Sequence, residues 1–196
     1  AYGSLPIYLL KISESLDSII PNTIDKDVRI LARTLSSLSD IGIIIGVTLL
    51  SKTILNRKYA LLIGILVSFS VIHIQLSHYF AVDTLATFFC IWGIFFLCRI
   101  SSYGYKSDYV FAGIFIGLAI SSKISVLPIY GALFTAHFLY ILNQDIKQIN
   151  IKNAMLLPLS IGVLASVLTF LIAQPYSVLD WSNFSSDIME QSEMVR

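Results

Sequence analysis

The stretch FAVDTLATFFCIWGIFFLC, residues 80–98, decides how this chain folds. Asp83 is its one charged residue, and nearly all the others are aliphatic or aromatic. An apolar helix needs about 20 residues to cross the hydrocarbon core of a bilayer, where each backbone polar group must be bonded within the segment. The stretch is therefore predicted to be a membrane-spanning helix that begins beside an acidic side chain.

The composition of the whole chain is typical of an integral membrane protein. Of its 196 residues, 56% are hydrophobic and 13% are charged, and the mean hydropathy is +0.81. Soluble domains carry about 25% charged residues. The formal net charge of +1 argues against a nucleic-acid partner, because that kind of binding requires a basic surface.

Further apolar runs on both sides of this stretch extend the prediction to an all-α, polytopic membrane fold. Two of the runs are separated by SSKIS (121–125), and Pro128 lies just inside the second, which indicates a tight hairpin whose turn dips toward the membrane. The six expected spans are 38–55, 59–76, 80–98, 109–121, 124–142 and 154–173.

The loops between these spans alternate in charge. Three loops that fall on one side hold lysine and arginine, and the positive-inside rule assigns them to the cytoplasm. The other side, which holds Asp83 and Asp180, has Lys123 as its one loop lysine. The cations of the first side are Lys52, Arg57, Lys58, Arg99, Lys106, Lys147 and Lys152.

The N-terminal segment SLPIYLLKISESLDSII (4–20) follows a different pattern. Its apolar residues recur at helical spacing from Leu5 to Ile19, and its charges fall off that face. This predicts a helix that lies in the outer interface and ends at Pro21. The expected organisation is a single transmembrane domain, with an outer segment at 1–37, spans at 38–173 and an outer segment at 174–196.

Two glycine pairs, in GIIIG (42–46) and GIFIG (113–117), have the spacing that lets helix backbones approach closely. We interpret them as contacts between spans of one chain rather than as a homodimer interface. The stretches 42–52 and 113–123 also echo one another, as the inverted repeats of transporters do. The similarity ends after eleven residues, so we do not interpret it as a repeat.

The cysteines and histidines form no ligand set for a metal. Cys90 and Cys98 lie inside one apolar run and are predicted to be buried thiols rather than a disulfide. One histidine beside one acid does not have the ligand spacing of a metal site. The sequence therefore indicates no cofactor, and a divalent metal stays an open alternative.

Asp83 is a charged residue at the start of an apolar run, and its position there requires an explanation. An ionised carboxylate facing lipid is costly, so its helical face is expected to point into protein or a wet cavity. The alternative is that Asp83 caps the start of its helix, near the positive end of the helix dipole. His78, close to Asp83, either donates a hydrogen bond to a substrate or faces water.

The cations on the outer side also have two interpretations each. Lys123 either snorkels to lipid phosphates or holds a phosphate in a site as a compact point charge. Arg29 and Arg33, one helical turn apart before the first span, either pair with Asp25 and Asp27 or face a lipid phosphate.

Five stretches together resemble one family, the GT-C membrane glycosyltransferases that use polyprenyl-phosphate sugars. The closer resemblance is to the protein O-mannosyltransferase and aminoarabinose-transferase group, in its phospholipid carrier-dependent branch. The most specific match is HIQLSHYFAVDTLATFF, with its His-Tyr pair and its Asp. The stretches are YGSLPIYLLK (2–11), RTLSSLSDIGIIIG (33–46), HIQLSHYFAVDTLATFF (73–89), GLAISSKISVLP (117–128) and QPYSVLDW (174–181).

The resemblance implies transfer of a sugar from a polyprenyl or dolichyl phosphate to an acceptor at the outer face of a prokaryotic cell membrane. Asp83 matches the family's second cavity-facing acid, a supporting catalytic residue. The family's principal acid is expected upstream of Ala1, so the chain is expected to be an N-terminally truncated piece, inactive alone. The resemblance implies substrate-binding roles for His78 and Tyr79 in the cavity, for Lys123 and Arg33 at the carrier phosphate, and for Tyr176.

Two alternatives remain at this stage. One is a multi-pass transporter or lipid flippase that uses Asp83 and His78 as a proton relay. The other is a membrane subunit without catalytic activity. The expected partners are the lipid-phosphate sugar donor, membrane lipids and an acceptor that is a protein, a lipid or a glycan. The sugar and the carrier are left open.

Overall fold

The computed structural model describes residues 3, 5–19, 28–143 and 156–194, and these form α-helices and one 3-10 helix, with no β-strand among them. This confirms the all-α prediction. The elements are α1 (Leu5–Ile19), α2 (Val28–Ile54), α3 (Arg57–Ser68), α4 (Val71–Ser77), α5 (Val82–Tyr103), α6 (Lys106–Ser122), η1 (Ile124–Val126), α7 (Ile129–Leu142), α9 (Leu157–Ala173), α10 (Tyr176–Leu179) and α11 (Trp181–Met194).

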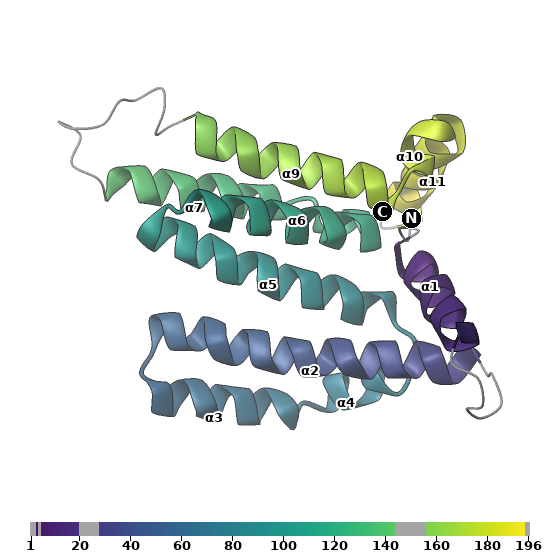
Figure 1. Ribbon diagram of the computed structural model, residues 1–196, viewed down its shortest axis with the longest axis horizontal. Helices are drawn as coiled ribbons and strands as arrows, with labels where there is room; N and C mark the ends of the chain where they lie inside the picture. Colours follow the sequence, from purple (N-terminus) through teal and green to yellow (C-terminus); the bar gives the residue numbers. More distant parts are fainter. Residues whose placement is uncertain (1–2, 4, 20–27, 144–155, 195–196) are drawn as a thin grey trace.

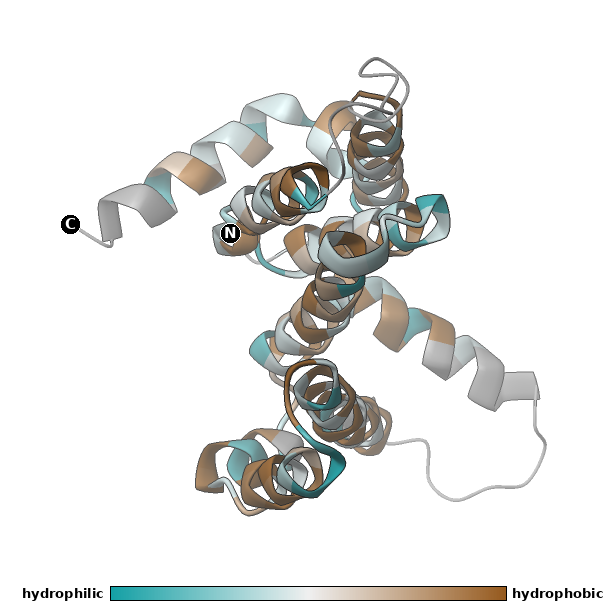
Figure 2. Cartoon of the chain, turned by 90° about the vertical axis from the view of Figure 1, so that its left-hand side faces the viewer, coloured by the Kyte–Doolittle hydropathy of each residue, from teal (hydrophilic) through white to brown (hydrophobic). Residues whose placement is uncertain are grey.

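The long helices lie side by side in a row, as Figure 1 shows. Helix α6 packs between α5 and α9, α2 packs on α5, α3 packs on α2, and α7 packs on α5 and α6. Helices α1, α10 and α11 gather where the long helices of the row have one set of their ends, which we call the α1 end of the row (Figure 1). Figure 2 shows the long helices end-on, with apolar residues along them, and several large apolar side chains of these helices are exposed, among them Phe138 and Ile172.

The passes alternate between the two ends of the row, as the hydropathy predicted. Three segments are long and apolar enough to cross a membrane, namely Ile30–Ile54, Val82–Tyr103 and Ile124–Leu142, and α9 is a shorter apolar helix. The loops that follow α2 and α5 lie at the end of the row opposite the α1 end (Figure 1). The loop that holds Lys147 and Lys152 lies outside the described residues.

The run 59–76 differs from the prediction, because it is two helices rather than one continuous span. Helix α3 ends at Ser68, and Ser70 takes an extended conformation (φ −66°, ψ 120°) before α4 begins. The hydroxyl of Ser68 donates to the Ile65 carbonyl at 2.7 Å. Serine side chains compete in this way for helix carbonyls, and two serines so close together weaken the helix where the run turns onto α2.

Two other boundaries also moved. Helix α2 begins at Val28, ten residues before the predicted start of the first span at 38, because the polar residues of the preceding segment continue the helix. The run 124–142 opens with one 3-10 turn and Pro128, and α7 begins only at Ile129. Proline is tolerated at the start of a helix because its missing N–H would have no partner there.

The glycine pairs mark helix contacts within the chain, as predicted. A Cβ placed on Gly113 would meet the Gly162 carbonyl, and one placed on Gly117 would meet the Ser166 carbonyl at 2.5 Å. Helices α6 and α9 therefore touch backbone to backbone. Gly42 and Gly46 instead leave room for aromatic and aliphatic side chains of α5.

Gly104 ends α5 in the left-handed conformation, with φ 66°. We expect Gly104→Ala to lower the free energy of unfolding by about 1–2 kcal/mol, because L side chains are strained at this φ. The new Cβ would also overlap the ring of Tyr140. Thermal unfolding of the solubilised protein measures the loss. Gly131→Ala is the control, since nothing lies within 4 Å of a Cβ there; equal melting of the two variants would contradict the prediction.

Candidate functional site

The Nζ atom of Lys123 lies 2.5 Å from Oδ1 of Asp83, at the α1 end of the row. Asp83 is in the first turn of α5, and Lys123 follows the last residue of α6. The two residues are forty positions apart in sequence, and the antiparallel packing of α5 and α6 joins them. Their side chains are 52% and 36% exposed, so the pair is open to a ligand.

The helix dipoles favour this arrangement of charge. Asp83 lies at the positive end of α5, and Lys123 lies at the negative end of α6, so each charge is stabilised by its own helix. The first residue before α5, Ala81, offers no side-chain cap, and the carboxylate of Asp83 is bonded to Lys123. The predicted alternative, in which Asp83 caps α5, is therefore not the arrangement in the structure.

Buried polar residues surround the pair. Ser121 and Ser122, just before Lys123, are fully buried, and both hydroxyls donate to the Leu118 carbonyl at 2.9 Å. Thr84, next to Asp83, is 3% exposed, and its hydroxyl has no hydrogen-bond partner within the described residues. The residues next to the pair in the sequence are thus buried in the ends of α5 and α6, whereas the side chains of Asp83 and Lys123 are exposed.

His78 and Tyr79 lie between α4 and α5, a few residues before Asp83. The Nδ1 atom of His78 lies 2.6 Å from the Ile74 carbonyl oxygen of α4 and donates a hydrogen bond to it. Tyr79 is 68% exposed. Both residues are at the α1 end, in the segment that leads from α4 into α5 and Asp83.

Arg33 lies apart from the ion pair, on the exposed face of α2. It borders a shallow hollow together with residues of its own helix, among them Ile30 and Ser37. Within the described part of the chain, Arg33 makes no ion pair with Asp83. Neither Lys123 nor Asp83 is among the described residues that line the hollow beside Arg33.

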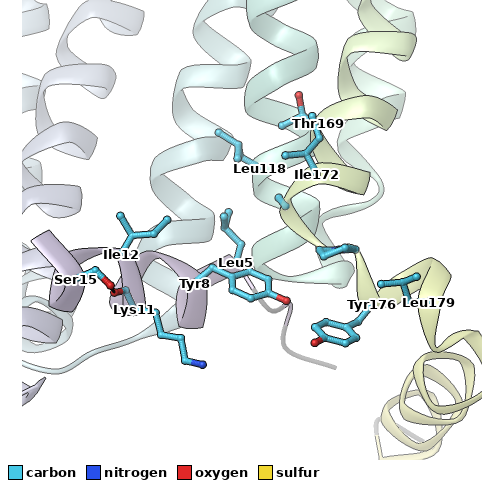
Figure 3. Close-up of a pocket in the computed structure, with 12 residues that line it drawn as sticks. Leu5, Tyr8, Lys11, Ile12, Ser15, Leu118, Thr169, Ile172, Tyr176 and Leu179 are labelled. Atoms are coloured by element: carbon cyan, nitrogen blue, oxygen red, sulfur yellow. Dashed lines mark hydrogen bonds between the residues drawn. The ribbon is translucent and has the colours of Figure 1, made fainter.

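Tyr176 lines a large apolar hollow at the α1 end, with a volume of about 800 Å³. Figure 3 shows Tyr8 of α1 and Tyr176 of α10 reaching toward one another on one side, with Leu118, Thr169 and Ile172 on the other. Among the described residues of its lining, Lys11 is the one that carries a charge. The lining residues are Leu5, Tyr8, Lys11, Ile12, Ser15, Leu118, Thr169, Ile172, Ala173, Pro175, Tyr176 and Leu179.

The position of His73 inside an apolar run predicts a hydrogen-bonded packing histidine, and the structure supplies a partner that the sequence reasoning did not identify. The Nδ1 atom of His73 on α4 lies 2.7 Å from Oδ1 of Asp40 on α2, and both side chains are largely buried. The signal was present, because Asp40 is an acid inside an apolar span and such residues need a partner. The contact ties α4 to α2 and so positions the loop that carries His78.

The opposite end of the row has its own polar contacts, which join helices rather than form a site. Arg99 donates from Nε to the buried carboxylate of Asp108 at 3.2 Å, across the turn between α5 and α6. Tyr109 and His137 share a buried hydrogen bond of 2.6 Å between α6 and α7. In the described residues no three histidine, cysteine or acidic side chains gather where they could hold a metal ion.

Comparison with known proteins gives one match. The model of a family described as dolichyl-phosphate-mannose-protein mannosyltransferase matches residues 22–173, which include every described helix from α2 to α9. No curated protein and no solved structure matches the chain. The matched region contains both Asp83 and Lys123, whereas α1 and α10 lie outside it.

Proposed function

Because the chain belongs to the dolichyl-phosphate-mannose-protein mannosyltransferase family, we propose that it transfers a sugar from a polyprenyl- or dolichyl-phosphate carrier to an acceptor, with Lys123 and Asp83 at the reacting end. The family establishes a glycosyltransferase that is an integral membrane protein. The ion pair carries the more specific proposal, because it presents an ammonium and a carboxylate together at the open end of the helical row.

The weakness of the ion pair suits it to bind a phosphate. Ion pairs between exposed side chains contribute only about 0–1 kcal/mol to stability. A phosphate of the carrier can therefore replace Asp83 at the Lys123 ammonium at little cost. The released carboxylate of Asp83 then faces the acceptor, where it orients the attacking hydroxyl group.

The reaction needs charge stabilisation at the leaving phosphate. The acceptor oxygen forms a bond to the anomeric carbon while the bond from that carbon to the phosphate oxygen breaks, and the hydroxyl proton leaves to a base. Negative charge then grows on the phosphate, where a fixed cation is worth more than in water. We assign this role to Lys123, and to Arg33 a weaker interaction with the phosphate as the carrier approaches along α2.

The apolar hollow beside α1 fits the isoprenoid tail of the carrier. It lies at the same end of the row as the ion pair, and its lining is apolar apart from a few groups, among which Lys11 is the cation. Burial of apolar surface is favourable by about 25 cal/mol per Å², so a hollow of this size binds part of a long hydrocarbon chain. Tyr176 contributes its ring to this surface.

We propose that this end of the protein faces away from the cytoplasm. The cationic loops with Arg57, Lys58 and Lys106 lie at the other end, and cationic loops are retained in the cytoplasm. His78 and Tyr79 are at the proposed outer end, where an acceptor arrives. The organism and the acceptor are not needed for this assignment.

The proposal is tested by sugar transfer in membranes. Membranes that contain the expressed protein are supplied with radiolabelled mannosyl phosphate on a dolichyl or a polyprenyl carrier. We expect label to pass to a membrane or protein acceptor from at least one carrier. A nucleotide sugar is the control donor, and it is expected to give no transfer.

Transfer from the nucleotide sugar alone would contradict the proposed donor class. Movement of the labelled carrier across the membrane without any transfer would favour a flippase instead. Either result would leave the family membership intact and overturn the reaction assigned to the ion pair.

A further inference from the structure

The backbone N–H of Gly3 donates to the carbonyl of Ser122, with 3.0 Å between nitrogen and oxygen. This bond joins Gly3 to the end of α6. Gly3 itself is buried, and so are Leu5 and Pro6 just after it. Leu5 belongs to a cluster with Leu85 of α5, so the contact is part of a packed region rather than a loose end.

A residue with a side chain does not fit at position 3. A Cβ atom built there would overlap the carbonyl group of Ser121. The obstacle is backbone in the last turn of a helix, which cannot move aside as a flexible side chain can. Glycine is therefore required for the chain to lie this close to α6.

The Ser122 carbonyl, which accepts the hydrogen bond from Gly3, belongs to the peptide group between Ser122 and Lys123. The last carbonyls of a helix have no partner within the helix, so an outside donor decides where they point. Helix α6 ends at Ser122, and Lys123 is already extended, with φ −152° and ψ 115°. The N–H of Lys123 still bonds to Ala119 at 3.0 Å. The peptide before Lys123 is thus held on both sides.

We propose that Gly3 is a positioning residue: through the Ser122 carbonyl it sets the direction in which the chain leaves α6, and so places the Lys123 ammonium against Asp83. The inference rests on the proposed function, in which Lys123 binds the carrier phosphate. It also goes beyond the family match, because Gly3 lies outside the matched residues 22–173.

The test is a double-mutant cycle on binding of a radiolabelled polyprenyl phosphate without sugar, to the protein in lipid nanodiscs. The variants are Gly3→Ala, Lys123→Ala and the two combined. A hydrogen bond to a charged group is worth enough to change affinity by about tenfold. We expect each single variant to weaken binding by about this factor. The combined variant should bind no more weakly than Lys123→Ala alone, because Gly3 acts through Lys123.

Gly131→Ala is the matched control, since it adds the same methyl group where nothing lies within 4 Å, and it should bind as the wild type does. Should Gly3→Ala unfold, Pro6→Ala replaces it in the cycle, because Pro6 is buried in the first turn of α1 and does not line the apolar hollow. Thermal unfolding of each variant shows which case applies.

Wild-type affinity in Gly3→Ala, or a combined loss equal to the product of the single losses, would overturn the positioning role while leaving Lys123 in the proposed site. A different result would contradict the proposed function rather than the role of Gly3 alone. If Lys123→Ala binds polyprenyl phosphate as tightly as the wild type, the phosphate site itself is wrong, and the role of Gly3 falls with it.

Discussion

Replacement of Lys123 by alanine is expected to slow sugar transfer by about a hundredfold to a thousandfold. This is the usual effect of removing one preorganised group that stabilises developing negative charge. The ammonium already lies at the end of α6, so it meets the leaving phosphate once the phosphate takes the place of Asp83. Lys123→Arg keeps the charge but spreads it over a planar group, so we expect partial activity.

Asp83→Asn should separate binding from reaction. The amide keeps the size of the carboxylate but cannot compete as an anion for Lys123. We therefore expect affinity for polyprenyl phosphate to stay at or above that of the wild type. Transfer should fall about a hundredfold, because the acceptor hydroxyl loses its orienting charge. Opposite changes in binding for Lys123→Ala and Asp83→Asn would be hard to explain by a loss of folding.

The measurement is the donor dependence of the initial transfer rate, with kcat and KM determined separately for each variant. Lys58→Ala is the control, because it removes an exposed lysine from the other end of the row. Full activity in both Lys123→Ala and Asp83→Asn would contradict the proposed roles of these residues in the reaction and leave them a structural role only. The family membership would stand in that case, and the reacting end would have to be sought elsewhere.

Hydropathy predicted the helical passes well, because the cost of unbonded backbone in lipid leaves few alternatives to helices. It did not predict where α3 stops and α4 starts. That break depends on hydroxyl groups that compete for carbonyls and on the bond between His73 and Asp40, and neither changes the mean hydropathy of the run. A window average treats Ser68 and Ser70 as mild exceptions within an apolar run.

The sequence named Asp83 and Lys123 as candidate site residues, but it did not predict that their side chains form an ion pair. Loop charges placed Asp83 and Lys123 on one side of the membrane, and the resemblance gave each a role. Neither argument pairs the two residues, because their contact depends on which helices are neighbours. Arg33 was grouped with Lys123 on the same reasoning, and in the structure it lines a hollow formed by described residues of α2 alone. Charge and sidedness select candidates, whereas helix packing decides which of them meet.

Gly117→Leu is expected to be strongly destabilising. A Cβ at this position meets the Ser166 carbonyl at 2.5 Å and the Thr169 Cβ at 2.8 Å, so both obstacles belong to α9 and one is backbone. Overpacked side chains commonly cost about 1–3 kcal/mol, and a leucine against a rigid backbone should exceed that range. Helices in membranes rely on such close approach, because lipid offers no hydrophobic force to press them together.

Thermal unfolding of the solubilised protein measures this effect, with Gly131→Leu as the control. Position 131 has open space around it, so a leucine there should leave the unfolding temperature close to that of the wild type. Similar unfolding temperatures for the two leucine variants would mean that α6 and α9 separate without cost. If Gly117→Leu instead melts early, the loss should extend to phosphate binding. Helix α6 ends one residue before Lys123 and cannot shift without moving it. The same helix contact would then support both the fold and the position of the reacting cation.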